Sequence, residues 1–228
     1  MREMVAWRTV AITDRRRLGV AHDAGPETIV QVLTAFSVAA KDAGLHAVQL
    51  REYDMPDGLL LQCATAMLAA TSSTLPLVIN DRAHVALASG AAGVHLRTSS
   101  MPSGRVRAVM GRNAVVGRSV HATREFASTE MEEVDYVLFG TVFTSASKPP
   151  AHPVAGLDRL EACCRAVGRH VVAVGGVSVA NCRQVAERGA AGIAAIGLFA
   201  DAWRRGGTAL GDVVAQLHEA WPETGERL

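Results

Sequence analysis

The segment HVVAVGGVSVANCRQVAERGAAGIAAIG, residues 170–197, decides the fold class. It begins and ends with short apolar runs, 170–177 and 192–197, and a helical pattern at 180–190 lies between them, with Ser178 as its expected N-cap. Runs that are apolar almost throughout are typical of strands buried on both faces of a parallel sheet. Parallel neighbours need a crossover connection, usually a helix. The segment therefore predicts a strand–helix–strand unit.

The same arrangement recurs along the rest of the chain. Six further apolar runs precede this segment, at 9–13, 46–52, 75–81, 92–96, 114–120 and 136–142. Helical patterns follow them, among them 59–70, and the pattern at 211–221 closes the chain. Eight such units fit a (β/α)8 barrel of the α/β class, because a doubly wound sheet usually has fewer strands. No linker or charge block divides the chain, so we expect a single TIM-barrel domain over residues 1–228.

Charge and hydropathy exclude several classes of function. The chain has 23 Lys and Arg residues against 22 Asp and Glu residues, which gives no electrostatic attraction to nucleic acid or to an anionic membrane. No apolar run approaches the ~20 residues that span a bilayer, and the opening MREMVAWRTV lacks the pattern of a signal segment. The four cysteines lack CxxC spacing, which favours reduced thiols. We expect a cytoplasmic protein that binds neither nucleic acid nor membrane.

Polar residues gather where the predicted strands end, and this end of a (β/α)8 barrel carries the chemistry. The residues at these positions are Asp14, Gln49, Arg51, Glu52, Asn80, Asp81, His95, Ser119, His121, Thr141, Lys148, Gly175 and Gly176. A purely structural core would not need so many polar groups at one end.

The ends of the last two predicted strands favour phosphate binding. Gly176 and Gly197, with their neighbours Gly175 and Ile196, lie in the two loops that often bind phosphate through backbone N–H groups in such barrels. Glycine lets the backbone approach an anion closely. The alternative is that these glycines only form tight turns. The spacing is not G-x-G-x-x-G, so no dinucleotide site is expected.

Nine ordered motifs match a known family. They are QLRE (49–52), INDR (79–82), GAAGVHL (90–96), GRSVH (117–121), DYVLFGTVF (135–143), SKP (147–149), GL (156–157), VAVGGV (172–177) and GAAGIAAIG (189–197). Their order and spacing over residues 8–200 resemble the thiamine phosphate synthase/TenI family. The resemblance implies a (β/α)8 barrel and a role in thiamine biosynthesis. Synthases of this family join hydroxymethylpyrimidine diphosphate to a thiazole phosphate with Mg²⁺, whereas TenI-type tautomerases aromatise a carboxylated thiazole phosphate without metal.

Two differences separate the chain from the synthases that it resembles. In synthases one metal-binding carboxylate belongs to the NDR motif, here Asp81, and a second follows the VHL motif, where this chain reads VHLRTSSM with Arg97 and no acid. Magnesium prefers oxygen ligands, and a cation repels it. Synthases also carry a lysine, which contacts diphosphate, where this chain has Tyr53. We therefore expect no cofactor, and Mg²⁺ only if the chain is a synthase.

The resemblance also implies a proton carrier. The GRSVH and LFGTVF…SKPP blocks look like those of TenI-like proteins, in which the residue matching His121 is proposed to carry the proton. A base with a pKa near 7 suits both halves of such a transfer. Ser119 lies two residues earlier on the same strand face, so we expect it to bind the substrate or orient the ring. The alternative for His121 is a polar residue that caps a helix starting near Thr123.

The remaining expected contacts bind the substrate. Arg51 is expected to clamp a carboxylate, with an internal ion pair to Glu52 or Asp81 as the alternative, and Asn80 is expected to orient the ring substituents. In the loop after 136–142, the expected substrate-binding residues are Ser145, Ser147 and Lys148, and the alternative for Lys148 is a solvated loop lysine. His95 is expected to be mainly structural, and Arg15, Arg16 and Arg17 to form a solvated loop.

The leading hypothesis is a metal-independent thiazole tautomerase of TenI type, an isomerase. One alternative is a transferase, a thiamine phosphate synthase with an altered metal site, and a further alternative is a non-catalytic regulatory protein that binds thiazole phosphate. The expected partner is a phosphorylated thiazole. Barrels of this kind often pair, so a homodimer is one expected state.

Overall fold

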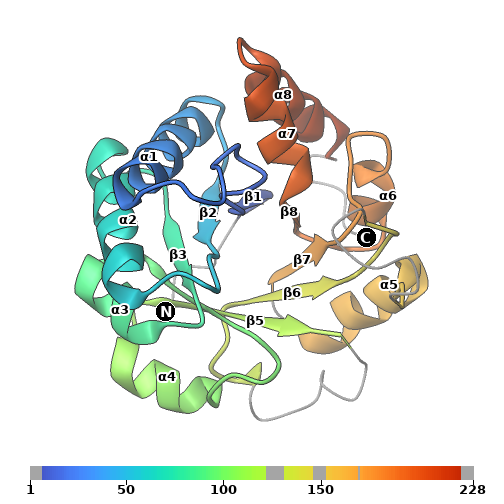
Figure 1. The fold of residues 1–228 in the computed structure, drawn as a ribbon. Coiled ribbons are helices and arrows are strands. Elements are labelled where there is room, and N and C mark those ends of the chain that lie inside the picture. Colours follow the sequence, from blue (N-terminus) through green and yellow to red (C-terminus); the bar gives the residue numbers. More distant parts are fainter. Residues whose placement is uncertain (1–6, 122–130, 146–152, 169, 222–228) are drawn as a thin grey trace.

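The computed structural model describes residues 7–121, 131–145, 153–168 and 170–221, and these form a closed parallel barrel surrounded by helices (Figure 1). The strands pair in chain order, and the barrel closes where β1 pairs with β8 through Val10 and Ala194. The strands are β1 (Thr9–Ile12), β2 (Ala47–Leu50), β3 (Leu77–Asn80), β4 (Gly93–Leu96), β5 (Val115–Val120), β6 (Tyr136–Gly140), β7 (His170–Val174) and β8 (Gly192–Ala195). The predicted (β/α)8 fold is confirmed.

Helices cover the outside of the barrel and connect its strands (Figure 1). Their bounds are α1 (Pro26–Asp42), α2 (Asp57–Ala70), α3 (Ala83–Ser89), α4 (Ser103–Met110), α5 (Gly156–Val167), α6 (Cys182–Glu187), α7 (Gly197–Arg205) and α8 (Ala209–Ala220). Among the described residues, no helix is both long and apolar enough to cross a membrane. The helix expected near Thr123 lies outside the described residues, as do both ends of the chain, so the extent of one domain over 1–228 stays a prediction.

Each strand is packed on both faces, which explains why the runs are apolar without alternation. The barrel interior is filled by one cluster: Trp7, Val10, Ile12, Ala47, Val78, Tyr136, Leu138, Val172 and Ala194. Their strand neighbours, such as Ala11 and Val171, belong to a larger cluster that also includes helix residues such as Leu33 and Leu160. The barrel wall therefore lies between two apolar layers.

The structure corrects the expected cap of the helix at 180–190. Ser178 does not cap it; the N-cap of α6 is Asn181, and the helix ends at Glu187. The Asn181 side chain turns back instead, because its Oδ1 accepts a hydrogen bond from the Ser178 backbone N–H at 2.8 Å and its Nδ2 donates to the Gly176 carbonyl at 3.0 Å. Asn181 thus fixes the loop that follows β7.

Candidate active site

A pocket of about 630 Å³ opens at the carboxyl ends of the strands. It brings together seven of the residues that the sequence predicts for the site: Arg51, Asn80, Ser119, His121, Ser145, Gly175 and Ile196. Gly176 and Gly197 directly follow two of these lining residues, and Ser147 and Lys148 lie outside the described residues. Whether these residues bind the substrate stays a prediction, but those that line the pocket share one space.

His121 directly follows β5 and has a fixed ring orientation. Its Nδ1 lies 2.5 Å from the backbone carbonyl oxygen of Gly140, at the end of β6. A carbonyl oxygen only accepts hydrogen bonds, so Nδ1 carries the proton and the lone pair of the neutral ring is on Nε2. Because the ring lines the pocket, His121 presents a base to whatever the pocket holds.

Ser119 is held by a chain of buried polar groups. Its Oγ lies 2.8 Å from Nε2 of His95, whose Nδ1 lies 3.1 Å from the Tyr136 hydroxyl. Burial lowers the pKa of His95 to about 3, so its ring is neutral at physiological pH. Both ring nitrogens are used in the chain, which agrees with the structural role expected for His95. Through His95, the barrel interior positions the Ser119 hydroxyl at the pocket surface.

Gln49 is a pocket residue that the prediction of substrate contacts did not include. Its Nε2 donates to Oδ1 of Asn80 at 2.9 Å, while its Oε1 is buried without a partner among the residues described. Gln49 is 2% exposed and lines the pocket. An unpaired buried acceptor costs about 1–3 kcal/mol unless a donor reaches it, so Gln49 favours a ligand with an N–H or O–H group. The signal in the sequence was the position of Gln49 two residues before Arg51, which places both side chains on the same face of the chain.

The loop after β7 has the backbone geometry of an anion site. Gly175 and Gly176 have φ of +96° and +65°, and a Cβ at Gly176 would lie 2.3 Å from the Thr144 carbonyl oxygen. Only glycine fits this conformation and this close packing. After β8, α7 begins at Gly197, and the first N–H groups of a helix have no intrahelical acceptor. The two loops therefore support the prediction of phosphate binding.

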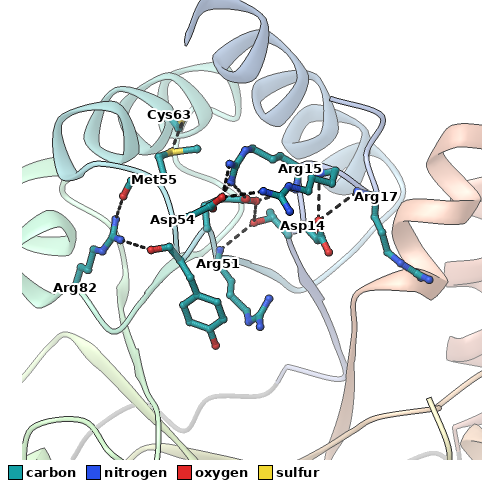
Figure 2. A network of polar contacts seen from close by, with 12 residues as sticks. Asp14, Arg15, Arg17, Arg51, Asp54, Met55, Cys63 and Arg82 are labelled. Carbon is teal, nitrogen blue, oxygen red and sulfur yellow. Dashed lines mark hydrogen bonds and ion pairs between the residues drawn. The ribbon is translucent and has the colours of Figure 1, made fainter. Parts of the chain in front are cut away.

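The run Arg15–Arg17 was expected to be solvated, and for Arg15 this is wrong. The Arg15 guanidinium pairs with Glu52 at 2.9 Å and with Asp54 at 2.7 Å (Figure 2). This contact lowers the pKa of the exposed Asp54 carboxyl to about 2. The side chain of Arg17 reaches the start of α7, where its Nη1 would lie 2.0 Å from a Cβ at Gly197. Only Arg16, with 60% of its side chain exposed, fits the expectation well.

Arg51 does not form an internal ion pair with Glu52 or Asp81, which was the alternative to substrate binding. Glu52 pairs with Arg15 and Asp81 pairs with Arg97, and no carboxylate among the described residues pairs with Arg51. Figure 2 shows the Arg51 side chain pointing away from the network of Arg15. Its guanidinium carbon lies 4.0 Å from the centroid of the Tyr53 ring, a cation–π contact. Arg51 therefore offers its N–H groups to the pocket.

Asp81 is not arranged to bind a divalent metal. Nε and Nη2 of Arg97 donate to its Oδ2 at 2.9 and 2.5 Å, and the Ser100 hydroxyl donates to its Oδ1. Both carboxylate oxygens are thus engaged, and one of the partners is a cation. Within the described ranges, no three His, Cys, Asp or Glu side chains are grouped so that they could hold a metal. The side chains here do not fit Mg²⁺, which prefers carboxylate oxygens.

Comparisons with known proteins agree with this barrel and with the ordered motifs. A family model described as thiamine monophosphate synthase matches residues 11–199. A thiamine-phosphate synthase of Roseiflexus castenholzii is 36% identical over 186 residues, which cover 81% of this chain and 77% of that protein. One from Caldanaerobacter subterraneus subsp. tengcongensis is 34% identical over 199 residues, which cover 86% and 91%.

A solved structure shows the same relationship in three dimensions. Thiamine phosphate pyrophosphorylase from Pyrococcus furiosus superposes with a TM-score of 0.74 at 25% sequence identity, covering 95% of this chain and 96% of that one. The names of these three relatives are those of enzymes that make thiamine phosphate, and they do not single out the TenI branch. The chain belongs to the thiamine phosphate synthase/TenI superfamily.

Proposed function

We propose that the protein is a metal-independent thiazole tautomerase that moves a proton on a carboxylated thiazole phosphate. The observation that carries the proposal is the pairing of Arg97 with Asp81, since it places a cation beside Asp81, near the position at which the resemblance implies a second acid in synthases. The family membership supports an enzyme of thiamine biosynthesis in general. The engaged Asp81 and the base at His121 favour proton transfer over metal-assisted release of diphosphate.

The geometry suits a single base that both removes and returns a proton. Nε2 of His121 would take the proton from a ring carbon, and the Gly140 carbonyl that holds Nδ1–H would stabilise the resulting imidazolium. The same nitrogen would return the proton to an exocyclic carbon while the double bonds shift into the ring. No atom is lost, and the ring becomes aromatic. Ser119, held by His95, would orient the ring beside His121.

The ends of the substrate would be held by different loops. The phosphate would lie at Gly175 and Gly176 and at the start of α7, where backbone N–H groups and glycine geometry favour an anion. Ser145 lines the pocket after β6, and the contacts of Ser147 and Lys148, which lie outside the described residues, stay predictions. Asn80, whose Oδ1 accepts from Gln49, would contact a ring substituent through its amide group.

The test supplies the non-aromatic carboxylated thiazole phosphate in the presence of EDTA and measures its aromatisation by ultraviolet absorbance. The wild-type protein should convert it, and His121→Ala should lower kcat by about 10²–10⁴-fold, the usual contribution of a general acid–base. His121→Ala should still bind the aromatic product, because the phosphate loops remain intact. No conversion by the wild type, or full activity in His121→Ala, would contradict the proposal.

A second candidate is a thiamine phosphate synthase, and the names of the relatives favour it directly. Asn80, Asp81 and Arg51 are the residues that it would share with them. The test supplies hydroxymethylpyrimidine diphosphate, thiazole phosphate and Mg²⁺, and measures thiamine phosphate by fluorescence after oxidation. Product formation would establish the synthase, and its absence at high protein concentration would remove this candidate. Retained thiazole phosphate binding without either activity would favour a non-catalytic binder.

A further inference from the structure

The charge of the pocket is one-sided. The described residues that line it include Arg51, Arg97 and Arg159 and no aspartate or glutamate. Asp81 forms an ion pair with Arg97 and so compensates the positive charge of that guanidinium. Arg51 and Arg159 have no carboxylate partner in the described part of the chain. A pocket of this kind attracts ligands with more than one negative group.

Arg97 uses only one edge of its guanidinium to hold Asp81. Nε and Nη2 both donate to Oδ2 of Asp81, at 2.9 and 2.5 Å. Its Nη1 has no partner among the described residues, and the side chain is 47% exposed at the pocket wall. A guanidinium has five N–H donors in a fixed plane, so the free end can donate to a ligand while the bound edge stays in place.

We infer that Arg97 stands in for a divalent metal: it neutralises Asp81 and, together with Arg51, forms a subsite for a carboxylate of the ligand. Arg97 follows β4, whereas Gly197 follows β8, four strands away in the eight-stranded barrel. The Arg97 side of the subsite therefore lies across the barrel from the start of α7. The pocket is built for a ligand with an anionic group at each end, and the arginines replace the charge that a metal would supply.

Both guanidiniums of this subsite contact the ring of Tyr53. The guanidinium carbons of Arg51 and Arg97 lie 4.0 and 5.5 Å from the centroid of the same ring. Two cations held by one ring repel each other, and a planar carboxylate that accepts hydrogen bonds from both offsets this repulsion. The tyrosine that replaces a cationic residue of the synthases thus gains a role as the platform of this subsite.

The segment that carries Tyr53 is fixed before any ligand arrives. Arg82 donates to the carbonyl oxygens of Met55 at 2.5 Å and Tyr53 at 2.9 Å (Figure 2). On the other side of the subsite, the Arg97 backbone N–H donates to the Ser100 hydroxyl at 2.7 Å, and Ser100 in turn donates to Asp81. Groups that are already positioned lose less entropy on binding, so the subsite can discriminate between ligands that differ by one carboxylate.

The experiment compares two ligands by calorimetry in EDTA: the aromatic carboxylated thiazole phosphate and the same thiazole phosphate without the carboxylate. The wild type should bind the carboxylated ligand about tenfold or more tightly, as a charge-assisted hydrogen bond allows. Arg97→Gln should lose that preference and keep the affinity for the plain thiazole phosphate. A preference that survives in Arg97→Gln would overturn the subsite.

Arg105→Gln is the matched control, since Arg105 is an exposed residue of α4 that does not line the pocket. It removes the same charge and should keep the full preference; a loss in both variants would mean that only net charge matters and would also overturn the subsite. The choice of ligands rests on the proposed function, but the readout is binding alone. Absent turnover with an intact carboxylate preference would reject the tautomerase and leave the subsite standing.

The role of Arg97 in place of a metal is tested separately by adding Mn²⁺ alone and measuring its binding by electron paramagnetic resonance. Arg97→Asp places two carboxylates at the ends of β3 and β4, so it should bind Mn²⁺ at least about tenfold more tightly than the wild type. Adding Asp81→Asn to this variant should remove the gain. Equal Mn²⁺ affinity in Arg97→Asp and the wild type would overturn the stand-in role.

Discussion

At the scale of the residue, the side chains packed around the GRSVH stretch explain which residue types it carries. Gly117, Ser119 and His121 alternate along β5 and its end. A Cβ at Gly117 would lie 2.2 Å from Cζ of Tyr136, whose hydroxyl contacts His95. His95 in turn contacts Ser119. The glycine therefore makes room for the polar chain that positions the serine, and the whole motif supports one corner of the pocket.

Gly117→Ala should destabilise the barrel. Tyr136 is fully buried and packs edge-to-face against Trp7 at 5.4 Å, so its ring has little space to move away from a new methyl group. Overpacking of this kind costs about 1–3 kcal/mol. Urea unfolding should show the loss. Gly58→Ala is the control, because nothing lies within 4 Å of its added Cβ on α2; it should leave stability unchanged or raise it, since alanine is the better helix former.

Spacing along the sequence predicts some of these contacts and not others. Ser119 and His121 could be placed in one pocket because strand side chains alternate and strand ends meet at one end of a barrel. The contact of Arg17 with the start of α7 could not be predicted, because it joins loops about 180 residues apart and depends on barrel closure. The pairing of Arg97 with Asp81 was likewise visible only in three dimensions, although its consequence for metal binding was expected.

At the scale of the element, the loop after β7 is held by the helix that follows it. The sequence predicts a serine cap at Ser178, since serine is a preferred N-cap residue. In the structure the N-cap is Asn181, three residues later, and its side chain bonds back to the loop at Gly176 and Ser178. Propensity alone could not decide between these two candidates, because the choice depends on the left-handed glycines that redirect the chain after β7.

Asn181→Asp should weaken phosphate binding, because it loosens this loop and adds a negative charge beside it. Aspartate keeps an acceptor for the Ser178 N–H, but it cannot donate to the Gly176 carbonyl as the Nδ2 of Asn181 does. Loss of one such hydrogen bond is worth about 0.5–1.5 kcal/mol, and we expect the Kd for thiazole phosphate to rise about three- to tenfold.

Calorimetry with thiazole phosphate and with the dephosphorylated alcohol separates this effect from a general loosening of the pocket. The affinity for the alcohol should stay nearly constant in Asn181→Asp. A parallel loss for both ligands would show that the loop after β7 does not act through the phosphate, and unchanged affinity for both would remove it from the binding site.

At the scale of the whole molecule, the pocket and a pair of histidines lie at opposite ends of the barrel. The pocket opens at the carboxyl ends of the strands. Near the other end, the Thr9 hydroxyl at the start of β1 lies 2.9 Å from Nδ1 of His46 and 3.5 Å from Nε2 of His218, in the last turns of α8. The rings of the two histidines are in edge-to-face contact at 5.2 Å. This contact links the first strand, the segment before β2 and the last helix.

The histidines near this end make the stability of the closed barrel depend on pH. Burial lowers the pKa of both His46 and His218, and the charges of Arg8, and for His46 also of His218 and His170, add to the effect. With a lowered folded-state pKa, each histidine binds its proton more readily in the unfolded chain, whose histidines have a pKa of about 6.5. The stability is therefore fully present above pH 6.5 and is lost as the pH falls toward the folded-state values.

The free energy of unfolding in urea should consequently fall between pH 7.5 and pH 5, and because both rings are partly exposed to solvent each should contribute clearly less than the limit of about 1.4 kcal/mol per pH unit. The double variant His46→Gln/His218→Gln removes both titrations but leaves every carboxylate in place, so its stability should change less over the same range. The difference between the two curves then isolates the histidine pair from acidic groups such as Glu52. Parallel curves for the wild type and the variant would show that acid acts elsewhere, and that α8 stays docked whether or not this pair is charged.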